Sequence, residues 1–141
     1  MSKWEIDPEA LKALSPAEKK RALADLKKFK ALVETNPLWS YNPHPKQHDY
    51  HCADTFIAAF IGGNRSGKTT AGVVDDIIQA VDREALPPWL AQYKRWEGEF
   101  YCRIVVPDLV STLEGVLLPT IRSWVPKDQL KSGSWDRAYD G

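Results

Sequence analysis

The chain has 141 residues, of which 43% are hydrophobic and 27% are charged, with acidic and basic side chains in equal number. This length suits one hydrophobic core, no apolar run approaches the ~20 residues of a membrane-spanning helix, and zero net charge argues against a uniformly basic nucleic-acid-binding protein. The first residues lack the pattern of a secretory signal and the only cysteines are Cys52 and Cys102, so we expect a cytoplasmic, non-secreted protein with reduced thiols.

Residues 1–40 are predicted to form an N-terminal helical segment. Ser15, Pro16 and Glu18 match a capping box with proline at the first helical position, which predicts a helix from Pro16 to about Glu34. Apolar residues recur at three- and four-residue spacing along it, so this helix is amphipathic. Its basic residues lie outside the apolar stripe and form either a solvated face or a contact surface: Lys19, Lys20, Arg21, Lys27, Lys28 and Lys30.

A proline-stiffened connector, residues 41–45, follows, and a short helix is predicted around residues 46–53. The apolar run over residues 55–61 is too short for a helix and is rich in aromatic and β-branched residues. It therefore predicts a fully buried β-strand.

Directly after this run, the sequence matches the phosphate-binding loop G-x-x-x-x-G-K-[ST]. In such a loop, backbone N–H groups and the positive end of a helix hold phosphates, the lysine reaches the β- and γ-phosphates, and the following hydroxyl binds Mg²⁺. We therefore predict an ATP and Mg²⁺ site, with Lys68 on the phosphates and Thr69 on the metal. The predicted nucleotide-binding residues of the loop are Gly62, Gly63, Asn64, Arg65, Ser66, Gly67, Lys68, Thr69 and Thr70.

A helix should follow the loop, with its apolar face buried and Asp75, Asp76 and Gln79 turned towards solvent. Residues 100–106 predict a second strand, and the order strand, loop, helix, strand implies parallel pairing through a right-handed crossover. The predicted class is α/β, with residues 41–141 forming an incomplete P-loop NTPase domain. A further helix, capped by Asp108 or Ser111, is predicted through Leu118 and again to about Trp124.

A complete ATPase of this kind needs an apolar strand that ends in an acidic pair, one carboxylate for Mg²⁺ and one to activate water. Asp108 follows an apolar run, but Pro107 intervenes and no second acid follows. We expect the chain to be the opening fragment of a longer protein.

The segment Tyr41-Asn42-Pro43-His44-Pro45-Lys46-Gln47, followed by Gly-Gly-Asn-Arg-Ser-Gly-Lys-Thr, resembles the large terminase subunits of tailed bacteriophages. This resemblance implies an ATP-driven motor that packages double-stranded DNA into a procapsid, with a nuclease domain after the ATPase domain. It also implies the small terminase subunit and the portal as partners, and a homo-oligomeric ring.

The resemblance places Gln47 on the adenine edge, with Tyr41 packing nearby, because an amide can pair with both a donor and an acceptor on adenine. A surface role for Gln47 stays open. Arg65 would act in catalysis together with Lys68, by neutralising charge on the γ-phosphate. A salt bridge that orders the loop, or contact with a neighbouring subunit, are the alternatives for Arg65.

Two other functions compete with this prediction. The first is a different P-loop enzyme, either a helicase-like DNA motor or a small-molecule kinase with an acceptor pocket in residues 82–98. The second is a non-catalytic module whose basic helix docks on DNA, on the small terminase subunit or on the portal.

Overall fold

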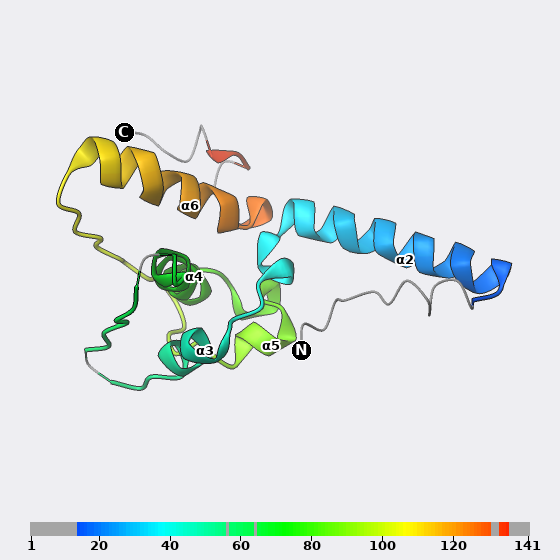
Figure 1. Cartoon of the computed structure of the whole chain (residues 1–141), viewed down its shortest axis with the longest axis horizontal. Helices are drawn as coiled ribbons and strands as arrows, with labels where there is room; N and C mark the ends of the chain where they lie inside the picture. Colours follow the sequence, from blue (N-terminus) through cyan, green and yellow to red (C-terminus); the bar gives the residue numbers. More distant parts are fainter. Residues whose placement is uncertain (1–13, 56, 64, 131–132, 136–141) are drawn as a thin grey trace.

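The computed structural model describes residues 14–55, 57–63, 65–130 and 133–135. Over these ranges the chain consists of helices joined by turns and irregular segments. Figure 1 shows one long helix that projects away from a body made of the other helices.

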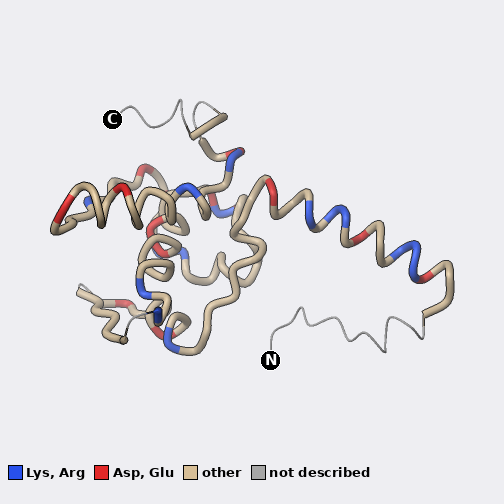
Figure 2. The backbone as a smooth tube through the Cα atoms, turned by 45° about the horizontal axis from the view of Figure 1, so that its top comes forward, with Lys and Arg blue, Asp and Glu red and all other residues tan. Residues whose placement is uncertain are grey.

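The projecting helix is α2 (Pro16–Thr35), and its predicted start and capping box are confirmed. The Ser15 amide donates to the Glu18 carboxylate over 2.8 Å, and the Glu18 amide donates to the Ser15 hydroxyl over 3.4 Å. None of the α2 residues is buried. Figure 2 shows basic and acidic residues spread along the whole of its length.

A single turn, η1 (Pro37–Ser40), connects α2 to the body. Asn36 begins this turn: its side-chain oxygen accepts from the Leu38 amide, and its side-chain nitrogen donates to the Ala85 carbonyl over 2.7 Å. Leu38 is thereby placed in the core. The short helix predicted next is α3 (Pro45–His51).

Helix α4 (Lys68–Ala80) is the centre of the hydrophobic core and begins at the lysine of the loop. Its apolar side chains recur at helical spacing, so one face is continuously buried. The core that surrounds this face consists of Leu38, Tyr41, Val73, Val74, Ile77, Ile78, Val81, Leu86, Leu90, Tyr93 and Leu117.

After α4 come the turn η2 (Arg83–Ala85) and the short helix α5 (Pro88–Ala91). This segment folds back over the C-terminal end of α4. The buried Lys94 ammonium donates to the Gln79 carbonyl over 2.8 Å and to the Ile78 carbonyl over 3.4 Å. A cation is favourable there because the last carbonyls of a helix lack intrahelical partners and carry negative partial charge.

The π-helical segment η3 (Leu109–Leu117) continues directly into α6 (Leu118–Trp124). In Figure 1 the two form one rod that crosses above α4. Pro119 stands in the first turn of α6, where a proline is tolerated because the first backbone N–H groups of a helix have no intrahelical acceptor. The turn η4 (Lys127–Gln129) follows.

The predicted α/β class is wrong: no β-strand or sheet occurs in the described residues, so the parallel strands expected over 55–61 and 100–106 are not formed. Ile61 is 88% exposed and Val105 is 84% exposed, whereas a strand covered on both faces would bury them. In the second segment, Phe100, Cys102 and Ile104 line a hollow beside α4, and the intervening residues face away from it.

The strand predictions failed for a physical reason. A run of apolar residues, or an alternation of apolar and polar residues, indicates only which side chains face the core and which face solvent. A strand also needs a neighbouring segment to complete its ladder of hydrogen bonds, which local sequence does not specify. The expected strand–loop–helix unit of the 41–141 domain is therefore a loop followed by a helix in this structure.

No helix among the residues described here is long and apolar enough to cross a membrane.

Candidate functional site

Among its described residues, the loop that enters α4 has two with left-handed backbone angles, Arg65 with φ of 61° and Gly67 with φ of 73°. A Cβ at Gly67 would lie 2.7 Å from the Gln47 side-chain nitrogen, and a Cβ at Gly62 would lie 2.8 Å from the Ser66 hydroxyl. Both glycines thus permit close packing that another residue would prevent. A Cβ added at Gly63 would meet no atom within 4 Å.

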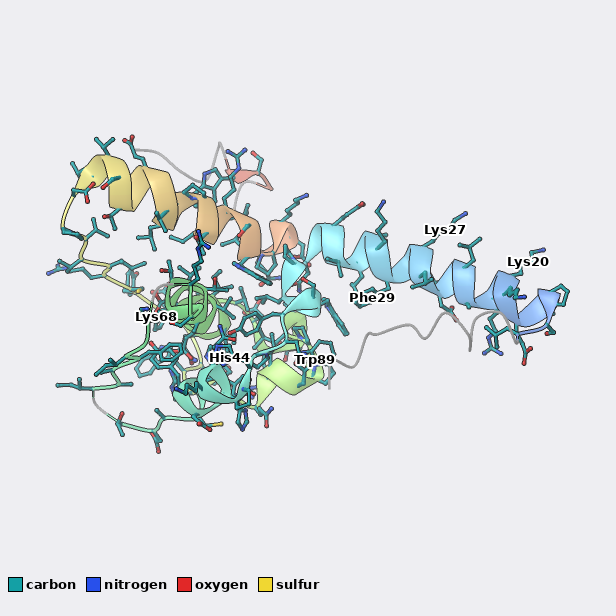
Figure 3. The ribbon with its side chains drawn as sticks, in the orientation of Figure 1. Lys20, Lys27, Phe29, His44, Lys68 and Trp89 are labelled. Atoms are coloured by element: carbon teal, nitrogen blue, oxygen red, sulfur yellow. The ribbon has the colours of Figure 1, made fainter. Side chains whose placement is uncertain are left out.

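The Lys68 ammonium closes this loop. Its Nζ donates to the Gly62 carbonyl over 2.7 Å, to the Gly63 carbonyl over 2.6 Å and to the Ser66 hydroxyl over 3.2 Å. Figure 3 shows Lys68 at the beginning of α4. The positive charge is therefore held over the loop by groups of the loop itself.

The other predicted loop residues have different surroundings. Thr69 is exposed and Thr70 is half-buried, both in the first turn of α4, where backbone N–H groups lack intrahelical acceptors. The Arg65 side chain is exposed and has no hydrogen bond or ion pair with the described residues, so a salt bridge that orders the loop is not formed with them. Asn64 lies outside the described residues.

Helix α3 is fastened to the loop by two side chains. The Gln47 side-chain nitrogen donates to the Gly67 carbonyl over 3.2 Å, and its oxygen accepts from the His44 amide over 3.0 Å. The His44 ring lies with Nε2 3.2 Å from the Ser66 carbonyl. Gln47 thus lies at the loop, and both ends of its amide contact backbone groups rather than being free for the adenine edge that the resemblance implies.

Tyr41 lies at a cavity of about 500 Å³ lined by Tyr41, Asn42, Pro43, His48, Trp89, Gln92 and Tyr93. Its hydroxyl lies 2.9 Å from His51 Nε2, and burial, the largest cause, raises the pKa of this phenol. Tyr41 thus remains a hydroxyl at neutral pH. Trp89 and Tyr93 also line this cavity; they lie in residues 82–98, where the alternative kinase function expected an acceptor pocket, but neither was named as a site residue.

A network of hydrogen bonds between polar side chains joins α3, α4 and the segment after α5. His51 Nδ1 lies 2.9 Å from Asp75 Oδ1, while Arg95 donates to Asp75 Oδ2 over 2.6 Å and to the His51 carbonyl over 2.8 Å. With Tyr41 donating to Nε2, this arrangement fits the His51 tautomer that has its proton on Nδ1. This hydrogen-bond network fixes the orientation of α4 against α3.

The prediction that Asp75 and Gln79 face solvent is therefore wrong. Asp75 is 8% exposed, and the buried Gln79 side chain donates to the Tyr93 carbonyl over 3.0 Å and accepts from the Arg95 amide over 2.8 Å. The two residues are one helical turn apart, and the segment after α5 covers this turn with polar partners. The four-residue spacing of Asp75 and Gln79 shows in the sequence that they share one face of the helix. The sequence does not show which polar groups cover that face.

Asp76 was also predicted to be solvated, and it is half-buried beside Cys102. Burial is the largest cause that raises the pKa of the Asp76 carboxyl, and a hydrogen bond with the Cys102 thiol partly opposes it. Burial and the neighbouring Asp76 charge raise the pKa of the thiol to about 11. The thiol therefore serves as a donor to the carboxylate.

The Asp108 carboxylate caps the N-terminus of η3. It accepts from the Ser111 and Thr112 amides over 2.6 Å and 3.0 Å, and from both of their hydroxyls. The Thr112 and Ser111 side chains are the main reason that the pKa of this carboxyl lies below its ordinary value. Asp108 has a structural role as a helix cap, which competes with the magnesium role considered from the sequence.

Comparison with protein-family models, with curated proteins and with solved structures gave no match.

Proposed function

We propose that this chain binds ATP with Mg²⁺ through residues 62–70. The observation that supports this most directly is Lys68, whose ammonium is held over the loop by the Gly62 and Gly63 carbonyls. Phosphate oxygens are stronger acceptors than carbonyls because they are charged, so a triphosphate would take over the lysine's hydrogen bonds. The first-turn N–H groups of α4 and its dipole favour the same anion.

The metal also fits the residues present. Mg²⁺ prefers oxygen ligands, keeps several waters, and is usually held by few protein groups together with substrate phosphates. Thr69 offers an exposed hydroxyl in the first turn of α4. In the described part of the chain, no cluster of three or more His, Cys, Asp or Glu is arranged for a metal ion, so Thr69 with nucleotide phosphates is the ligand set that we assign.

In the intact protein, we propose that this site belongs to a DNA-packaging motor of the terminase large-subunit kind. The support is the sequence pattern of residues 41–47 followed by Gly62 to Thr69, together with the hydrogen bonds that join these two segments. ATP hydrolysis would drive translocation of double-stranded DNA, with the small terminase subunit and the portal as partners in a homo-oligomeric ring. Arg65, exposed on the loop, would neutralise γ-phosphate charge during hydrolysis.

Lys68→Ala tests the site. We expect this variant to lose binding of a non-hydrolysable ATP analogue, measured by isothermal titration calorimetry, because it removes the ammonium assigned to the β- and γ-phosphates. Lys46→Ala is the matched control, since Lys46 is an exposed lysine on α3. Equal affinity of the Lys68→Ala variant and the parent would refute the assignment.

A docking role for α2 is a second candidate, because none of its residues is buried and its leucines share the surface with lysines. Reversal of charge at Lys27, Lys28 and Lys30 should then weaken binding of double-stranded DNA at low salt. Unchanged binding would leave these lysines as a solvated helix face.

A further inference from the structure

The cavity of about 500 Å³ beside α3 and α5 is within the size range of small-molecule sites, which is about 300–1,000 Å³. Tyr41, Trp89 and Tyr93 are among its lining residues, and the polar tip of each is already bonded inside the protein. Trp89 Nε1 donates to the Tyr41 carbonyl over 3.2 Å, the Tyr93 hydroxyl lies 2.6 Å from His48 Nδ1, and the Tyr41 hydroxyl lies 2.9 Å from His51 Nε2. These bonds hold the rings in place. Tyr41 and Tyr93 are each 4% exposed, so the half-buried Trp89 is the ring of the three with surface available to a flat ligand.

Asn42 is a lining residue whose side-chain amide is available at both its donor and its acceptor. It is exposed at the cavity, and its side-chain amide has no hydrogen bond with any residue that the structure describes. The Gln92 side-chain nitrogen, by contrast, donates to the Trp89 carbonyl over 2.7 Å. An amide supplies a donor and an acceptor side by side, which matches the N7 and N6 edge of adenine but not the two acceptors, N7 and O6, of guanine.

Gln47 lacks this freedom. It is 6% exposed, its oxygen accepts from the His44 amide, and its nitrogen donates to the Gly67 carbonyl. Reading a base would require both bonds to break and the loop to lose its fastening. Gln47 is therefore placed to support the loop.

The cavity and the loop are close along the chain. Asn42 is two residues before His44, so their Cα atoms are within about 8 Å of each other, and the His44 ring contacts the Ser66 carbonyl of the loop. His44 and His48 are four residues apart, a spacing that places side chains near one another along α3. Figure 3 shows His44 lying between Lys68 and Trp89 in projection.

We propose that the base of the bound nucleotide lies in the cavity against Trp89, and that Asn42 is the residue that selects adenine. This inference rests on the proposed ATP site, because the triphosphate on the loop positions the base. It replaces Gln47 as the specificity-determining residue and gives Gln47 a positioning role in the loop.

The test compares three probes on the full chain by isothermal titration calorimetry: a non-hydrolysable ATP analogue, the matching GTP analogue, and inorganic tripolyphosphate. Asn42→Ala should lower affinity for the ATP analogue about tenfold or more, leave tripolyphosphate unchanged, and bring the ATP and GTP analogues to similar affinity. Gln47→Ala should weaken all three probes by a similar factor. Asn42 is exposed, and circular dichroism checks that both variants fold.

Failure of the two proposals can be distinguished. If the parent chain binds none of the three probes, the proposed ATP site is wrong. If the parent binds the ATP analogue and Asn42→Ala keeps the preference over GTP while Gln47→Ala abolishes it, the ATP site stands and Gln47 reads the base. Retention of the preference by both variants would also overturn the role of Asn42.

Discussion

The Asp75 carboxylate and the His51 ring lie 2.9 Å apart in the interior, and this pair joins the helix that begins at Lys68 to the helix that contacts the loop. Arg95 reaches the same carboxylate from the segment after α5. One buried acid thus orients three parts of the chain that are distant in sequence.

Asp75→Ala should reduce the free energy of unfolding by about 1–3 kcal/mol, because it leaves buried His51 and half-buried Arg95 groups without their acceptor. Urea denaturation followed by circular dichroism measures this change. Asp49→Ala is the control, since Asp49 is exposed on α3. A loss for Asp75→Ala no larger than that for Asp49→Ala would contradict the structural role of the pair.

Two isoleucines test the corrected fold. Ile78 is fully buried on α4, whereas Ile57 is 80% exposed in the run predicted to be a buried strand. Ile78→Ala should cost about 2–5 kcal/mol of unfolding free energy because it opens a cavity, and Ile57→Ala should cost less than about 0.5 kcal/mol. Similar large losses for both, in urea denaturation, would show that residues 55–61 are packed in solution.

Gly67→Ala should impair the loop more than Gly63→Ala does. A Cβ at Gly67 meets Gln47 and requires a left-handed backbone, which costs a residue with a side chain about 1–2 kcal/mol, while a Cβ at Gly63 meets nothing within 4 Å. Thermal unfolding and ATP-analogue titration of both variants measure the difference. If Gly63→Ala proved as harmful as Gly67→Ala, the loop would have another conformation in solution.

The Cys102 thiol should react slowly with iodoacetamide in a Cys52→Ser chain. Its pKa is raised to about 11 by burial and by the Asp76 charge, and only the thiolate is nucleophilic. The raised pKa means that the thiolate fraction is small at pH 8 and increases towards pH 11. Asp76→Asn removes the charge and should accelerate the reaction at pH 8. An unchanged or slower rate would show that the Asp76 charge does not raise the pKa of the Cys102 thiol.

Local signals in the sequence were sufficient for the starts of several helices. The Ser15–Glu18 capping box placed the beginning of α2 at Pro16, and the loop motif predicted that a helix follows it, as α4 does from Lys68. These features depend on residues a few positions apart, through capping bonds and backbone angles. Membership of the predicted loop in a nucleotide site remains a proposal that the ATP-analogue titrations test.

Only the tertiary structure decided which polar side chains are buried and which apolar runs remain exposed. Asp75 is inside because His51 and Arg95, 24 and 20 residues away, supply its hydrogen bonds. The described residues of the run 55–61 form no strand, because no described segment pairs with them. Burial and strand pairing depend on partners brought together by folding, so the sequence of one segment does not determine them.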